Sequence, residues 1–199
     1  MTYLPETLTT RYLIKKESYK ISMEVNDAIH NDKDIFLRKI KVVNEDDSKH
    51  EVRLFLTQDF HIYGYEAGDT TFFEPNLSAI VHYKRKRYFL VGGRSGGKGF
   101  YQYAIGYKEV EGREGTWRDA EDGQLSNNAV AQGAVDSAVS FKLDIPPHVY
   151  GLIHYWIACG NSLNEVTNLD SVVKQVGVEQ MLLEAENFWS AWLNRLKLG

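Results

Sequence analysis

Hydrophobic and polar residues alternate through most of the first 160 residues of the chain. The clearest run extends from Val135 to Ile145, where apolar residues and one serine occupy every second position and mostly polar residues lie between them. A period of two predicts a strand with one buried and one solvated face. We expect this strand to end at Pro146 and Pro147, because proline cannot donate a hydrogen bond to a sheet.

The next apolar run is almost continuous and extends from Leu152 to Ala158. Such a run is typical of a strand that is covered on both faces. Because only a Pro-Pro-His loop separates it from the preceding strand, we expect the two strands to pair with each other in antiparallel fashion.

Shorter apolar runs predict further strands at Ile35–Val43, Val52–Leu56, Ile80–Tyr83, Tyr88–Val91 and Phe100–Tyr107. The basic run from Lys84 to Arg87 lies between two of them, and in an acidic protein we expect such a hairpin tip to be a solvated turn. Strands at this spacing, without helical patterns between them, indicate a sandwich or barrel and not an α/β fold.

The pattern changes after Gly160. Ser162 and Glu165 have the spacing of a capping box, an apolar period typical of a helix follows, and Gly177 suits a helix end. A second helix is expected to begin near Val178, with an apolar stripe too wide for an isolated surface helix. We expect its large side chains to pack on a surface outside this chain; they are Phe188, Trp189 and Trp192.

Composition narrows the class of protein. The 199 residues suffice for a core that needs no disulfides, and the single cysteine, Cys159, lies in an apolar run where a buried thiol is expected. A net charge of -4 argues against a nucleic-acid partner. No apolar stretch approaches the roughly 18 residues of a membrane span, and the N-terminus does not resemble a signal peptide. We therefore expect a soluble, cytoplasmic protein without a membrane partner.

The glycine-rich run from Gly92 to Gly99 nearly matches a phosphate-binding loop. Gly99, however, stands where a serine or threonine must bind magnesium. A strand pattern also follows, whereas a phosphate loop must open a helix whose N-terminus meets the anion. We interpret the run as a flexible glycine loop.

Polar side chains gather after the strand that starts at Val52. If that strand continues, alternation places Asp59, His61 and Tyr63 on one face, with Asp69 shortly after them. Two such ligands are too few for a zinc site, so no metal is expected. The residues suit either a hydrogen-bonded cluster at a strand end or contact with a sugar or a neighbouring active site.

A second polar cluster contains Trp117, Arg118 and Asp119, followed by Glu121 and Asp122. Paired carboxylates carry out glycoside hydrolysis, but carboxylates this close on an irregular segment more often cap turns or pair with arginine. We expect a structural or interface role here. Motifs of nucleophilic, metal-dependent or dinucleotide-dependent catalysis do not occur in the sequence, so it predicts neither catalytic residues nor a cofactor.

Several separate segments match one known family in order: Leu56–Asp69, Asp119–Asn128, Ala131–Ser137, Tyr155–Ser162 and Phe188–Leu193. They resemble the N-terminal region of prokaryotic glucoamylase-like enzymes of glycoside hydrolase family 15. The resemblance covers most of the chain from about Asp34 onward. It implies a mainly β fold, an antiparallel β-supersandwich similar to glucodextranase N domains and galactose mutarotase, followed by a short C-terminal helical segment.

The resemblance also implies an organisation. Residues 1–160 would form the sandwich, and residues 161–199 a helical linker that leads to an (α/α)6 barrel, where two glutamates hydrolyse α-glucosidic bonds. The chain would then be a non-catalytic accessory domain, with that barrel and α-glucan oligosaccharides as partners. The family carries additional strands before the stretch that matches Tyr3 to Glu24. A sandwich without them would have an unpaired edge, and we expect self-association.

Two other functions fit the sequence. A stand-alone carbohydrate-binding module would use exposed aromatic rings such as Tyr63, Tyr65 or Trp117, whereas a structural role would bury them. An independent enzyme of the mutarotase type would need histidines and carboxylates that converge on one site. The strand positions of His61, His82 and His154 give no sign that they converge.

Overall fold

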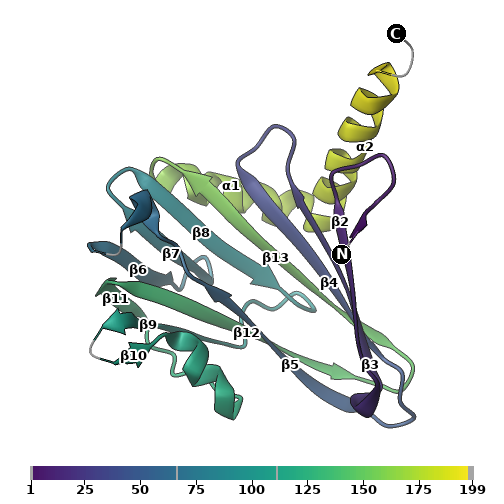
Figure 1. Cartoon of the computed structure of the whole chain (residues 1–199), viewed down its shortest axis with the longest axis horizontal. Helices are drawn as coiled ribbons and strands as arrows, with labels where there is room; N and C mark the ends of the chain where they lie inside the picture. The colour runs from purple at the N-terminus through teal and green to yellow at the C-terminus, as the bar shows by residue number, and fades with distance from the viewer. Residues whose placement is uncertain (1, 66, 111, 197–199) are drawn as a thin grey trace.

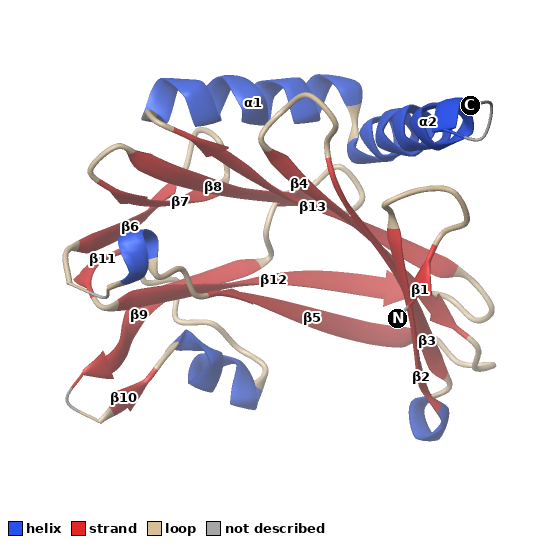
Figure 2. Ribbon diagram, turned by 45° about the horizontal axis from the view of Figure 1, so that its top comes forward, coloured by secondary structure: helices blue, strands red, loops and turns tan. Residues whose placement is uncertain are grey.

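Residues 2–65, 67–110 and 112–196, which the computed structural model describes, form two antiparallel sheets (Figures 1 and 2). In spatial order, the nine-stranded sheet contains β1 (Thr2–Tyr3), β2 (Thr10–Lys16), β3 (Ile21–Ile29), β4 (Ile35–Asn44), β13 (Tyr150–Gly160), β8 (Arg87–Arg94), β7 (Ala79–Lys84), β6 (Asp69–Glu74) and β11 (Val130–Gly133). The four-stranded sheet contains β10 (Arg113–Glu114), β9 (Gln102–Val110), β12 (Val135–Ile145) and β5 (His50–Gln58). The predicted mainly β, antiparallel sandwich is confirmed.

The expected pairing of the two longest strands is wrong. β12 lies between β5 and β9 in the small sheet, and β13 lies between β4 and β8 in the large one. The Pro146–Pro147 turn therefore crosses from one layer to the other, where the Asn44 amide donates to the Ile145 and Pro146 carbonyls, each at 3.1 Å. Both strands have an apolar face, and stacking the layers buries both faces in one core.

Packing on both faces of the large sheet explains part of the glycine run, because Trp156 lies in the core beneath the helices and Phe141 in the core between the sheets. A Cβ atom at Gly92 would lie 2.3 Å from the Trp156 ring, and one at Gly93 would lie 2.4 Å from the Phe141 ring. Both glycines belong to β8, so the expectation of a flexible loop is wrong for them. The strand β9, and not a helix, follows the run. This order of elements agrees with the rejection of a phosphate-binding loop.

Two helices cover the outer face of the large sheet: α1 (Leu163–Val176) and α2 (Val178–Leu196). As the capping pattern predicts, the Ser162 hydroxyl accepts a hydrogen bond from the Glu165 N–H, and the Gly177 N–H donates to the Val173 carbonyl. Among the described residues, no helix is both long enough and apolar enough to cross a bilayer. Residues 197–199 of the expected helical segment lie outside the described residues.

The two helices differ in how far they are covered. α1 lies along β13 and β8, where the buried indole N–H of Trp156 donates to Asp170 at 3.0 Å. The first half of α2 packs on β3 and β4 through Val178, Met181, Leu182 and Ala185. Beyond Ala185, α2 extends away from the sandwich (Figure 1).

β5 forms an outer edge of the small sheet, because β12 is its paired neighbour there. Its register with β12 is continuous over nine residues, without a bulge. A groove of about 300 Å³ lies beside it, lined by the apolar side chains of Tyr12, Ile14, Met23, Val25, Ile40, Leu54 and Leu56, and by Arg38. An edge of this kind is where another strand can add.

Candidate functional site

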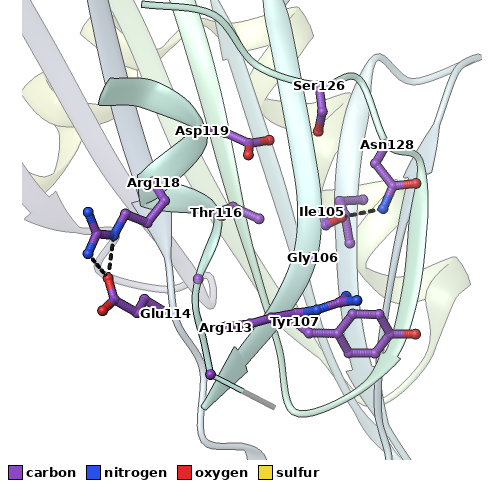
Figure 3. Close-up of a pocket in the computed structure, with 12 residues that line it drawn as sticks. Ile105, Gly106, Tyr107, Arg113, Glu114, Thr116, Arg118, Asp119, Ser126 and Asn128 are labelled. Carbon is purple, nitrogen blue, oxygen red and sulfur yellow. Dashed lines mark hydrogen bonds and ion pairs between the residues drawn. The ribbon is translucent and has the colours of Figure 1, made fainter. Parts of the chain in front are cut away.

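A polar cleft of about 530 Å³ lies on the small sheet, between β9, β10 and the 3-10 helix η3 (Thr116–Asp122) (Figure 3). We call it the η3 cleft. Most of its lining side chains are polar; the lining residues are Ile105, Gly106, Tyr107, Gly112, Arg113, Glu114, Gly115, Thr116, Arg118, Asp119, Ser126 and Asn128.

The close fit of η3 against β9 requires glycine at two positions. A Cβ atom at Gly106 would lie 2.9 Å from the Thr116 methyl carbon. One at Gly115, whose φ of +113° favours glycine, would lie 2.6 Å from Asp136 Oδ2. The buried Asp136 carboxylate accepts the Thr116 N–H at 2.8 and 3.1 Å and so holds the start of η3. Burial raises the pKa of this carboxyl.

Ion pairs fix the arginine at the cleft mouth. Arg118 contacts Glu114 closely and reaches the Glu121 carboxylate at 3.2 Å. The hydrogen bond to Glu114 is the main cause that raises the pKa of the Arg118 guanidinium. Its guanidinium carbon also lies 4.8 Å from the centre of the Trp117 ring, whose indole N–H donates to the Glu114 carbonyl at 2.8 Å.

Two of the predicted site residues line the cleft, together with five polar or aromatic residues that the sequence analysis did not single out. Arg118 and Asp119 line it, and Trp117 lines an adjoining hollow on the other side of β10. The missed residues are Tyr107, Arg113, Glu114, Ser126 and Asn128. A usable signal was the pair Gly112 and Gly115, both with positive φ, because glycines that bracket two polar residues indicate a tight reversal.

The predicted strand through Tyr63 does not exist, so the expectation that Asp59, His61 and Tyr63 share a strand face is wrong. β5 ends at Gln58, and the chain turns through the short 3-10 helix η2 (Ile62–Gly64), with Tyr63 at φ 61°. The turn buries Ile62 and stacks Phe60 on Phe89, with ring centres 4.5 Å apart. The chain leaves the strand here because the turn packs both of these apolar side chains against the protein, which a continued strand would not do. We call residues 59–65 the rim loop.

Asp59 and His61 nevertheless meet, on a buried lysine. His61 Nε2 lies 3.6 Å from Asp59 Oδ1 and 3.3 Å from Lys108 Nζ, and Asp59 forms a close ion pair with the same ammonium. The Lys108 side chain is 3% exposed, whereas both partners are half exposed. β9 therefore anchors the start of the rim loop from beneath.

Asp69 lies apart from this cluster. It opens β6 and pairs with Lys84 at 2.8 Å, and both side chains are almost fully buried. Lys84 also donates to the Tyr65 carbonyl at 2.6 Å, and its Nζ lies 3.4 Å from the centre of the Tyr65 ring. The basic run is thus not wholly a solvated turn, because Lys84 points inward to neutralise a buried carboxylate.

The three histidines do not converge. His82 lies between the layers, with Thr71 Oγ1 at 2.9 Å and Ser137 Oγ at 2.8 Å, and burial lowers its pKa to about 3. His154 lies on the opposite face of the large sheet, near Glu179 of α2, and burial lowers its pKa. His61 remains on the rim loop.

Among the described residues, no three histidine, cysteine, aspartate or glutamate side chains are placed to hold a metal ion. Cys159 is partly exposed and not fully buried as expected, because it lies at the end of β13. Burial is nevertheless the main cause that raises the pKa of its thiol. This thiol is therefore a poor nucleophile.

The predicted linker residues form one aromatic cluster on the distal half of α2. The Trp189 ring centre lies 5.2 Å from that of Phe188 and 5.9 Å from that of Trp192. Trp189 also lines a groove of about 450 Å³ against the first three strands. Phe188 and Trp192 are exposed, at 42% and 47%.

Comparison with known proteins identifies the fold. No family model matches the chain, and no curated protein matches it in sequence. Among solved structures, a bacterial glucoamylase complexed with acarbose superposes with a TM-score of 0.74 at 13% identity, over 98% of this chain and 28% of that one.

Two further enzymes share the fold, both at 13% identity. A candidate kojibiose phosphorylase from the human microbiome superposes with a TM-score of 0.55, over 91% of this chain and 22% of that one. A family GH92 α-mannosidase from Bacteroides thetaiotaomicron gives a TM-score of 0.52, over 91% and 23%. The chain thus spans about a quarter of each enzyme, and its fold is that of a β-sandwich domain of such enzymes.

Proposed function

We propose that this chain is a non-catalytic accessory domain of a larger glycoside-active enzyme, packed against a catalytic module. The observation that carries the proposal is the extent of the likeness, which spans 98% of this chain and only 28% of the bacterial glucoamylase. From the resemblance in sequence, we take the catalytic module to be an (α/α)6 barrel and its substrate to be an α-glucan.

Three acidic side chains in and near the candidate site support a role without bond cleavage. A general acid must be accessible to the substrate and protonated near the working pH. Asp59 is paired with Lys108, and Glu114 is paired with Arg118. Asp136, whose pKa is raised by burial, is 4% exposed and holds the Thr116 N–H.

The distal half of α2 supplies the docking surface in this proposal. Clustered exposed aromatic side chains mark sites of interaction with other proteins. The exposed Phe188 and Trp192 both contact the ring of the partly buried Trp189. The first half of the same helix is buried on the sheet, so the cluster is held on a rigid support.

The rim loop supplies contacts near the neighbouring active site. Asp59 and His61 are half exposed, and the buried Lys108 fixes both. In the enzyme joined to its catalytic module, His61→Ala should raise KM with little change in the unfolding midpoint. If KM and kcat are unchanged, the rim loop does not contact the neighbouring active site. That result would not affect the proposed docking surface on α2.

The docking surface can be tested in the chain itself. A Phe188→Ser, Trp192→Ser double variant should keep its unfolding midpoint but lose concentration-dependent self-association and the binding of a hydrophobic dye. Sedimentation velocity and dye fluorescence measure both. If the unchanged chain is monomeric at high concentration and binds no dye, this face is not a docking surface.

A stand-alone carbohydrate-binding module is the second candidate. It is favoured by the exposure of the three aromatic side chains named for it, at 48% for Tyr63, 42% for Tyr65 and 45% for Trp117. Such a module would bind sugar equally well after the double change on α2, whereas an accessory domain would lose its contact with the catalytic module.

A further inference from the structure

We infer that the η3 cleft and the two aromatic rings beside it form a binding site for an uncharged oligosaccharide. The cleft and the adjoining hollow share Gly112, Arg113, Glu114 and Arg118, so β10 forms the ridge between them. Tyr107 lines one side of this ridge and Trp117 the other. A ligand that covers both rings must cross the ridge, which calls for more than one sugar unit.

The charges of the cleft favour a neutral ligand. Its two arginines, Arg113 and Arg118, are balanced by Glu114 and Asp119. Arg118 is already held by Glu114 (Figure 3) and also contacts Glu121 at 3.2 Å. An anionic ligand that binds Arg118 would have to displace these two carboxylates, whereas a neutral ligand leaves the Arg118 ion pairs intact.

The polar groups offer donors and acceptors together. The Asn128 amide nitrogen donates to the Ile105 carbonyl at 2.6 Å, which fixes the orientation of this amide (Figure 3). The Ser126 hydroxyl and the Asp119 carboxylate lie on the same side of the cleft (Figure 3). Sugar hydroxyls both donate and accept hydrogen bonds, so this mixture suits them.

Both aromatic rings are held in place by a cation on one side. The Arg113 guanidinium carbon lies 5.1 Å from the Tyr107 ring centre, and that of Arg118 lies 4.8 Å from the Trp117 ring centre. The rings remain 38% and 45% exposed. A rigid ring with a solvated face suits the apolar C–H face of a pyranose, because little side-chain entropy is lost on binding.

The experiment is an NMR titration of the 199-residue chain with neutral probes: maltose, maltotetraose, kojibiose and α-1,2-mannobiose. We expect at least one probe to shift the amide signals of Tyr107, Trp117, Ser126 and Asn128. Tyr107→Ala and Trp117→Ala should each weaken that binding about tenfold or more. Tyr101→Ala is the matched control, because Tyr101 is equally exposed and carries Arg53 and Lys142 over its ring outside the cleft.

Three results would overturn the inference. They are no shift with any probe at millimolar concentration, shifts that persist unchanged in both cleft variants, and tighter binding of glucose 1-phosphate than of every neutral probe. Loss of binding in the Tyr101 variant alone would likewise place the site elsewhere. None of these results bears on the aromatic cluster of α2, so the accessory role can stand or fall separately.

Discussion

The rim loop and the distal half of α2 differ in what their side chains contact: buried ion pairs hold the first, and exposed aromatic rings mark the second. Beneath the rim loop, two lysines are buried against carboxylates, Lys108 against Asp59 and Lys84 against Asp69. On the distal half of α2, the large side chains of Phe188 and Trp192 are exposed. The first arrangement fixes polar groups at defined positions within one chain. The second leaves apolar surface whose burial needs another protein body.

The largest effect should come from breaking the fully buried ion pair. Lys84→Met keeps most of the side-chain volume but leaves Asp69 buried without its cation. We expect the free energy of unfolding to fall by about 3–5 kcal/mol, measured by urea denaturation. Arg87→Met in the same hairpin is the control and should change it by less than about 0.5 kcal/mol, because Arg87 is exposed. Equal effects would contradict the buried role of Lys84.

Substitutions at two nearby positions on α2 allow its buried and exposed faces to be compared. Met181 is buried at 1% exposure, whereas Leu183 is 47% exposed. Met181→Ala should lower the free energy of unfolding by about 2–5 kcal/mol through the cavity it leaves. Leu183→Ala should change it by no more than about 0.5 kcal/mol. A large loss at Leu183 would mean that this face is covered within the chain.

The buried imidazole between the layers predicts a dependence of stability on pH. The pKa of His82 is lowered to about 3, so the folded chain keeps it neutral where the unfolded chain binds a proton. Stability contributed by the neutral form is complete above about pH 6.5 and is lost as the pH falls toward 3, at about 1.4 kcal/mol per pH unit. His154 acts in the same direction, since its pKa is also lowered.

Urea denaturation of the His82→Gln variant at several pH values checks this slope. The glutamine can still bond to Thr71 and Ser137 but does not titrate. Below pH 6, we expect the free energy of unfolding of the original chain to fall more steeply with decreasing pH than that of the variant. A difference between the two that stays constant from pH 7 to pH 4 would contradict the neutral, buried state of His82.

Local periodicity predicted the helices and strands well. It failed to predict which strands pair, because contacts between residues far apart in the sequence decide the pairing. The helix start at Ser162 and the strand from Val135 depend on neighbouring residues, and both are as predicted. The pairing of the last two long strands was wrong because burial in a common core, and not proximity in sequence, selects the partners of each strand. No local pattern distinguishes a tight hairpin from a turn that crosses between layers.

The candidate site was only partly predictable for the same reason. Sequence reasoning found Asp59 and His61 but not Lys108, which is 47 residues beyond His61 and is brought near it because β12 pairs with both β5 and β9 in the small sheet. It found Arg118 and Asp119 but not Tyr107 or Asn128, which β9 and the segment before β11 bring to the cleft. Residues in one strand or turn were identifiable, whereas those joined by tertiary packing were not.

Whether this chain supports catalysis without performing it can be measured by incubating it with maltotetraose and following the sugar anomeric protons by NMR. We expect an unchanged anomeric spectrum over a day, with or without added phosphate. Release of glucose, or of glucose 1-phosphate when phosphate is present, would contradict it and would require an active site within these 199 residues.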